Sequence, residues 1–364
     1  MRKIISGKRE VILPFLAVFI SCVGIVNAYS STYYYSHPGI QIYLKQAIWL
    51  VAGLFVMIAV ASMKENVFEE SSYVLYAFFI VSLIFVLVFG KVFGGSKRWL
   101  SLGPLNIQPS EVGKIFFVLA VSRFFSDRFT TSGMELRDLA VPFLMTLVPF
   151  VLIAYQPDLG TAGLYFLIFI GVSVVARLSL KSMVKLGVSG LITVPLLWMM
   201  MKGYQKERVV SFMSPEKDPF GTGYHIIQSK IAIGSGGFWG KGFLNGTQGQ
   251  LRFLPEQHTD FAFSVLAEEW GFIICLVMIL LFLFFILRLF YLSMQVQDRY
   301  SSFVISGIGI YFLVQVFINF AMVMGLFPVV GVPLPFVSYG GSSMIANMLA
   351  VGVVINQSRT RFIL

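Results

Sequence analysis

The chain has 364 residues, of which 57% are hydrophobic and only 12% are charged, and this excludes an ordinary soluble domain. Lysine and arginine outnumber aspartate and glutamate by 27 to 17, a net charge of +10 that favours anionic lipid head groups or a phosphate-bearing substrate as partners. No basic stripe with interleaved aromatic residues occurs, so nucleic acid is not an expected partner.

Apolar runs of about twenty residues recur along the chain and predict membrane-spanning helices. We expect an all-α polytopic fold of about ten transmembrane helices. It would form a single membrane domain over 1–364, with one large extracytoplasmic loop at 202–260 between helices 7 and 8. The predicted spans are 11–30, 44–62, 72–90, 109–125, 138–155, 159–176, 184–201, 261–288, 301–325 and 340–357. Positive charge in the short loops favours both termini in the cytoplasm, which places the long loop outside.

The outer loop between the third and fourth spans, Gly94 to Leu100, is glycine-rich and predicts a turn that carries Lys97 and Arg98. The fourth span then opens on Pro109, a typical helix start. One turn inside it lies Lys114, three residues after Glu111. A lysine at the bilayer centre costs roughly 2.5–3.5 kcal/mol, so we expect Lys114 to face a cavity, with an internal ion pair to Glu111 as the alternative.

Two further segments interrupt the apolar pattern. Tyr155 to Thr161 breaks one long apolar run, and Asp158 within it is either the cap of the next helix or a functional acid. The segment 202–260 is glycine-rich and too long for a plain loop, and 224–233 predicts a short helix inside it. The chain has no ATP-binding P-loop, zinc-protease or serine-hydrolase motif.

The stretch from Leu254 to Gly271 ends a long polar segment and holds four carboxylates together with His258. If the helix begins early, Glu256, Asp260, Ser264 and Glu268 are four residues apart and share one face. Carboxylates entering a membrane usually serve a site, although an N-terminal cap would explain one or two of them. Further along, Pro333 to Ser343 predicts a re-entrant link, since prolines and glycines at membrane depth line cavities.

These segments place acids and bases at one side of the membrane. The gathered residues are Lys97, Arg98, Lys114, Asp158, Arg252, Glu256, His258, Asp260, Ser338 and Ser342. Without an ATP motif, two classes remain. One is a transferase that uses an activated lipid-borne donor; the other is a transporter or flippase with a polar site at the midplane. The one-sided clustering favours the transferase. A scaffold protein, the third alternative, would leave Lys114 and Asp158 without a purpose.

Four motifs together resemble the SEDS family (shape, elongation, division and sporulation), in that family's order and over nearly the whole chain. They are Gln108-Pro109-Ser110-Glu111, Gln156-Pro157-Asp158-Leu159-Gly160-Thr161, Leu254-Pro255-Glu256-Gln257-His258-Thr259-Asp260-Phe261 and Pro333-Leu334-Pro335-Phe336-Val337-Ser338-Tyr339-Gly340-Gly341-Ser342-Ser343. Gln257 and the lead-in at 329–333 are more similar to the rod-shape branch than to the division branch. Asn106 departs from relatives that have an arginine there.

The resemblance implies a ten-helix enzyme of the bacterial cytoplasmic (inner) membrane that polymerises lipid II into peptidoglycan glycan strands for cell elongation and rod shape. Lipid II is an undecaprenyl-diphosphate-linked disaccharide-peptide. Lipid II flipping is the alternative function. The implied partners are a class B penicillin-binding protein, a transpeptidase, and other elongation-machinery proteins. The aspartate matching Asp260 is essential in the family, and Lys114, Glu111, Arg98 and Asp158 match residues implicated in activity.

The implied reaction inverts an α-linked diphosphate donor into a β-1,4 linkage, so it needs one displacement and one base. Asp260 is the best candidate base, and nearby acids would raise its pKa. Lys114, Arg98 and Arg252 are candidates to neutralise the diphosphate. A divalent cation, Mg²⁺ or Mn²⁺, held by Asp260 or Asp158 is an open alternative. Small residues on the ninth span, Ser306 and Gly309 among them, predict a docking face for the partner's helix.

Overall fold

The computed structural model describes most of the chain, namely residues 10–33, 41–64, 66–93, 96–102, 105–129, 133–201, 203–218, 221–251, 253–254 and 256–359. Its long helices are α1 (Ile12–Thr32), α2 (Ile42–Ala61), α3 (Val67–Phe89), α4 (Pro109–Asp127), α5 (Ala140–Tyr155), α6 (Leu159–Val175), α7 (Leu180–Met200), α11 (Ala262–Gln295), α12 (Arg299–Val323) and α13 (Gly341–Gln357). Each predicted span coincides with one of these helices, and the helical fold class is confirmed.

Composition distinguishes the helices that could cross a bilayer. Within the described residues, six stretches are long and apolar enough by themselves: α1, α2, α3, α11, α12 and 136–155, which contains α5. Helix α6 is apolar but shorter. The number of ten crossings therefore stays a prediction. Local signals set several ends: Pro109 opens α4, and the side chain of Asp298 caps α12 by accepting a hydrogen bond from the Ser301 amide.

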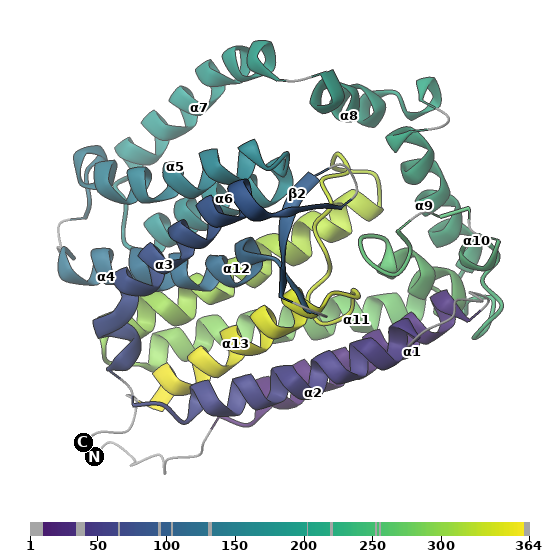
Figure 1. Ribbon diagram of the computed structural model, residues 1–364, viewed down its shortest axis with the longest axis horizontal. Helices are drawn as coiled ribbons and strands as arrows, with labels where there is room; N and C mark the ends of the chain where they lie inside the picture. The colour runs from purple at the N-terminus through teal and green to yellow at the C-terminus, as the bar shows by residue number, and fades with distance from the viewer. Residues whose placement is uncertain are drawn as a thin grey trace.

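The loop expected at 202–260 has its own secondary structure in the described part. It contains α8 (Gly203–Met213), α9 (Thr222–Gly236) and the one-turn helix α10 (Thr247–Gln250), with a 3₁₀ turn at Pro215–Lys217. A second 3₁₀ turn, Leu136–Leu139, precedes α5. The short helix predicted at 224–233 lies inside α9 and is confirmed. In Figure 1 α9 and α10 lie beside the start of α11, at the far end from the last turns of α13, and α8 lies above them.

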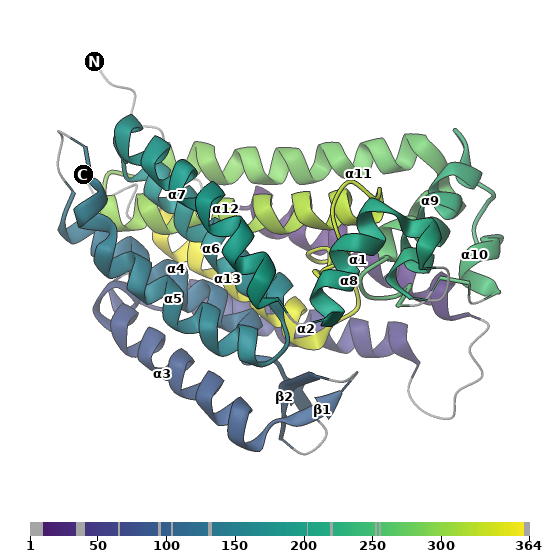
Figure 2. The same ribbon diagram turned by 90° about the horizontal axis from the view of Figure 1, so that it is seen from above.

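The basic segment after α3 forms a small sheet, and the prediction of a simple turn there was wrong. Strands β1 (Lys91–Phe93), β2 (Ser96–Leu102) and β3 (Leu105–Ile107) pair antiparallel in chain order. Leu100 pairs with Ile107, so the strands lead directly into α4. The sheet lies beside the end of α3 (Figure 2), which gives Arg98 on β2 a fixed direction.

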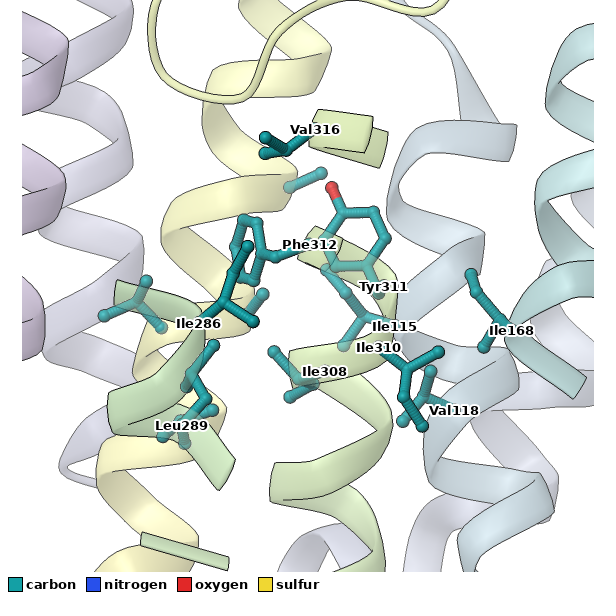
Figure 3. Close-up of a cluster of buried hydrophobic side chains, with 14 of the residues drawn as sticks. Ile115, Val118, Ile168, Ile286, Leu289, Ile308, Ile310, Tyr311, Phe312 and Val316 are labelled. Atoms are coloured by element: carbon teal, nitrogen blue, oxygen red, sulfur yellow. The ribbon is translucent and has the colours of Figure 1, made fainter. Parts of the chain in front are cut away.

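Helix α12 is the centre of the bundle. Within its apolar window 83% of the residues are buried, against 22–44% for the other candidate spans. It contacts α4 and α6 on one side and α11 and α13 on the other. Figure 3 shows Ile310 and Tyr311 directed toward Ile115 and Ile168, while Phe312 lies toward Ile286. A buried central helix can hold polar side chains only where they find partners.

Helix α11 is broken near its start, at Gly271, whose backbone has φ 74° and ψ −174°. The turn at 237–242 bridges this break. The amides of Lys241 and Gly242 donate to the carbonyls of Glu268 and Glu269, and the amide of Phe272 donates to the carbonyl of Gly237. The backbone groups freed by the break are thus satisfied by another segment, as burial requires.

Candidate active site

Asp260 lies in a turn at 256–261, immediately before α11, and is half-buried. Its carboxylate faces Gly331: a Cβ added to that glycine would lie 3.3 Å from Asp260 Oδ2. Gly331 has φ +73°, a conformation that side chains disfavour, so glycine serves both the turn and the close approach. The backbone carbonyl of Asp260 accepts a hydrogen bond from Asn319 Nδ2 of α12 at 3.0 Å.

The surroundings of Asp260 make it a weak acid. Burial, the largest cause, and the charges of Glu256 and Asp158 together raise its pKa from an ordinary value of 3.8 to about 7. Arg98 and Arg208 act in the opposite direction and lower the pKa. An aspartate with a pKa near neutrality can take up a proton during a reaction, which is what a general base must do.

Asp158 and Arg98 form the second part of the site. Asp158 caps α6, its Oδ1 accepting from the Thr161 amide at 3.1 Å, and this confirms the predicted cap. Its Oδ2 lies 3.3 Å from Arg98 Nη1. Arg98 Nη2 also donates to the carbonyl of Pro157 at 2.6 Å. The guanidinium is thus fixed on the turn before α6 while the Arg98 side chain remains 23% exposed.

Backbone contacts bring these two parts together. A Cβ on Gly160, at the start of α6, would overlap the carbonyl of Val330, the residue before Gly331. The first turn of α6 therefore packs on the link between α12 and α13, and that same link packs on Asp260. Segments far apart in the sequence thus place Asp158, Arg98, Glu256 and Asp260 at one site.

Lys114 and Glu111 lie deeper. Lys114 Nζ is 2.8 Å from Glu111 Oε1 and donates to Gln315 Oε1 at 3.3 Å, and it lies 5.2 Å from the centre of the Tyr311 ring. The Lys114 side chain is 0% exposed. The ion pair, the alternative reading of the sequence, is therefore present, and Lys114 faces packed side chains rather than the expected cavity.

The remaining predicted residues have mixed surroundings. Lys97 Nζ donates to the carbonyls of Leu87 and Val88, both at 2.8 Å, and so caps the end of α3. Ser338 accepts from the amide of Leu334 at 2.8 Å, and Ser342 accepts from the amide of Gln108 at 3.0 Å. Their roles in substrate binding stay predictions. Arg252 lies outside the described residues.

Glu256 and His258 flank the acid. Glu256 is exposed, and its Oε2 accepts from Thr259 Oγ1 at 3.0 Å. The carbonyl of His258 accepts from the amide of Tyr339 at 2.8 Å, which ties the turn to the link before α13. Burial lowers the pKa of His258, and Glu256 opposes that effect. Burial thus favours the neutral form of His258.

The row of four polar residues on one helical face was a wrong prediction. Helix α11 begins only at Ala262, so Glu256 and Asp260 precede it. Ser264 bonds with Ser229 of α9 at 2.8 Å. Glu268 is 0% exposed and accepts from Lys241 Nζ at 2.6 Å and from the Thr247 amide at 2.8 Å. Glu268 thus holds the loop together, and only the first two residues of the row belong to the site.

Three residues of the site were not predicted from the sequence. Arg208 of α8 acts on the charge of Asp260, Asn319 holds its backbone, and Gly331 contacts its carboxylate. Gly331 lies in the segment 329–333, which leads into the last family motif, so the sequence indicated its role only weakly. Nothing in the sequence distinguishes Asn319 from any other polar residue in a span.

The side chains around Asp260 do not make a metal-binding set. Among the described residues, no group of three or more histidine, cysteine, aspartate and glutamate side chains could hold an ion. Asp158 already pairs with Arg98 and caps α6. Divalent cations need more oxygen ligands than Asp260 alone supplies. The cation stays a prediction.

Comparisons with known proteins agree in one direction. Residues 10–362 match the family described as cell cycle proteins, FtsW, RodA and SpoVE. Peptidoglycan glycosyltransferase MrdB of Escherichia coli K12 is 42% identical over 311 residues, covering 84% of this chain and 83% of that protein. Peptidoglycan glycosyltransferase RodA of Treponema pallidum is 32% identical over 410 residues, covering 93% and 94%.

Solved structures show the same likeness. One is a chain from a study of the structural coordination of polymerization and crosslinking by a peptidoglycan synthase complex. It aligns with a TM-score of 0.83 at 32% identity, over 98% of this chain and 99% of that one. The rod shape determining protein RodA of Thermus thermophilus aligns with a TM-score of 0.73 at 27% identity, over the same shares.

Proposed function

The chain belongs to the FtsW, RodA and SpoVE family of cell cycle proteins, and from this we propose that it is a peptidoglycan glycosyltransferase that polymerises lipid II. The observation that carries the mechanism is the environment of Asp260. This half-buried acid has a pKa of about 7 and lies beside two arginines, at the end of an apolar helical bundle. Such a site suits a reaction between two lipid-borne sugars at a membrane surface.

The proposed step is a single inverting displacement. The acceptor 4-hydroxyl attacks the anomeric carbon of the donor, the bond from that carbon to the diphosphate oxygen breaks, and Asp260 takes the hydroxyl proton. The lipid diphosphate leaves with the bonding electrons, and Arg98 and Arg208 stabilise its charge. General-base assistance of this kind contributes about 10²–10⁴-fold to rate. The donor bond supplies the energy, so no ATP site is needed.

The experiment that tests this function is direct. Purified protein in detergent is incubated with lipid II, and glycan polymer is resolved on a gel. Polymer from the wild-type protein supports the function. An Asp260→Asn variant purified in parallel excludes a co-purifying polymerase, because a contaminant would give equal product in both samples. Absence of polymer from correctly folded wild-type protein, both with and without its partner, would overturn the proposal.

We also propose that the site faces away from the cytoplasm of the bacterial inner membrane, with both termini inside. A class B penicillin-binding protein would then reach the product on the same side. The test is cysteine labelling in intact cells with an impermeant maleimide. A cysteine at exposed Asn245, in the turn between α9 and α10, should label, whereas one at exposed Lys64, just after α2, should not. The reverse pattern would invert the topology.

A further inference from the structure

Two amide side chains of α12 hold the backbone beside Asp260. Asn319 Nδ2 donates to the carbonyl of Val332 at 2.7 Å, and Gln315 Nε2 donates to the carbonyl of Pro333 at 3.0 Å. The two amides are four residues apart, so they lie on one face of the helix. Both are 0% exposed. Together they fix the link immediately after Gly331.

Asn319 makes a second bond that joins this link to the acid. The same Nδ2 donates to the backbone carbonyl of Asp260 at 3.0 Å. Since Gly331 lies against the Asp260 carboxylate, one amide holds both the turn that carries the acid and the surface on which the acid rests. The amide itself stands on α12, the most buried of the candidate spans.

The support continues to α4. Gln315 Oε1 accepts from Lys114 Nζ at 3.3 Å, and Lys114 is paired with Glu111 at 2.8 Å. An ion pair in a membrane helix is costly, and this one is far from solvent. Because Lys114 bonds to the oxygen of the Gln315 amide, the ion pair orients that amide so that its nitrogen faces the carbonyl of Pro333.

We propose that Asn319 is the positioning residue of Asp260, supported by Gln315 and, through it, by the Glu111–Lys114 pair. This inference rests on the proposed function. Asn319 touches neither sugar; it keeps the carboxylate against Gly331, at the distance from the acceptor hydroxyl that proton transfer needs. Misplacement of a catalytic group by about 1 Å can cost on the order of 10²-fold in rate.

The test compares Asn319→Leu with a matched control, Asn356→Leu. Asn356 of α13 is also 0% exposed, and its Nδ2 also donates to two backbone carbonyls, those of Val60 and Met63, far from Asp260. We expect Asn319→Leu to lower kcat for lipid II polymerisation by about tenfold or more, with KM changed little. Asn356→Leu should lower thermal stability without this effect on kcat.

A pH profile separates positioning from lost folded protein. Glu256, Asp158, Arg98 and Arg208 are the charged groups that act on Asp260. When Asn319 no longer holds the turn, the carboxylate gains water, and the acid limb of the rate profile should move to lower pH. Asn319→Ser, which keeps one donor, should give an intermediate kcat and is the second variant if the leucine variant does not fold.

The outcomes are distinguishable. No polymer from the wild-type protein contradicts the proposed function. Suppose instead that the wild-type enzyme is active and depends on Asp260. An unchanged kcat and an unchanged acid limb in Asn319→Leu or Asn319→Ser would then overturn the role of Asn319. An equal shift of the acid limb in Asn356→Leu would also overturn it, because the effect would then be general.

Discussion

At the scale of single residues, the environment that suits Asp260 to act as a base also lowers the stability of the folded protein. Its folded pKa of about 7 lies above the ordinary 3.8, so the folded protein binds a proton more tightly than the unfolded chain does. Stability therefore falls as pH rises from about 4 to about 7, and the cost remains above pH 7. The protein tolerates this cost at the position where a base is needed.

We expect Asp260→Asn to abolish glycan polymerisation and to leave the fold intact, because the amide keeps the shape but cannot accept the proton. At pH 8 its melting temperature should equal or exceed that of the wild-type protein, since a partly buried charge is removed. The measurements are the gel assay and a thermal melt. Product near the wild-type level would remove Asp260 from the mechanism.

The pH dependence of the wild-type reaction follows from the same pKa. The base must be ionised, so kcat/KM, which reports the free enzyme, should rise with pH through about 7 and level off above it. Initial rates of polymerisation between pH 5.5 and 8.5 measure this. A flat profile across that range would show that Asp260 titrates elsewhere or does not limit the rate.

At the scale of elements, the turn that bridges the break in α11 contains an ion pair between buried Glu268 and the partly exposed Lys241. Glu268 accepts from Lys241 and from the amides of Thr247 and Gln248. A glutamine at position 268 would keep the side-chain volume, but its NH₂ group would face the N–H donors that now bond to the carboxylate. We expect Glu268→Gln to cost about 1–3 kcal/mol of stability, the usual range when buried donors lose their acceptor, because Lys241 keeps contact with water. Thermal melts measure it.

A matched control for that change is Glu70→Gln, on the exposed surface of α3. It should alter stability by no more than about 0.5 kcal/mol. If Glu268→Gln has the same melting temperature as the control, the turn at 237–242 holds the broken helix without the help of the Glu268 carboxylate.

The pair on α4 allows a prediction at the same scale. Lys114→Met leaves Glu111 buried without its cation, so both stability and activity should fall. Adding Glu111→Gln should restore the melting temperature but not polymerisation, because Gln315 still lacks the donor that orients it. Melts and gel assays on both variants test this. Recovery of activity in the double variant would make the pair structural only.

At the scale of the whole molecule, the partner's docking face is not where the sequence placed it. Ser306 is 2% exposed, and its Oγ donates to the carbonyl of Ser302 at 2.8 Å. A Cβ on Gly309 would meet the Phe290 ring at 3.4 Å. The small residues of α12 therefore admit helices of this same chain, and that prediction was wrong.

A bulky residue at Ser306 should consequently destabilise the fold itself. We expect Ser306→Trp to cost about 1–3 kcal/mol by overpacking and to lower the yield of folded protein. Phe317→Leu, on the same helix but 67% exposed, is the control and should have little effect. Thermal melts of the protein without any partner measure both. If Ser306→Trp is as stable as the wild-type protein, the face around Ser306 would again be a candidate docking surface for the partner.

Composition and local pattern determined the helices and much of the site. Apolar runs predicted the position of each long helix, and for the six stretches that are apolar enough to span by themselves a bilayer leaves no other stable form. Pro109 and Asp158 began helices as expected, since their backbone preferences act within one turn. Asp260 was identified because an acid beside an apolar run is expensive and seldom lacks a purpose.

Tertiary structure alone decided which faces meet. Lipid tails are as apolar as leucine, so the pattern cannot distinguish a helix such as α12, 83% of whose apolar window is buried, from one such as α3, with only 22% buried. Polar partners are equally hidden in the sequence. Glu268 and Asp260 looked alike there, yet one is held by Lys241 and the other lies against Gly331, because packing of distant segments chooses the partner.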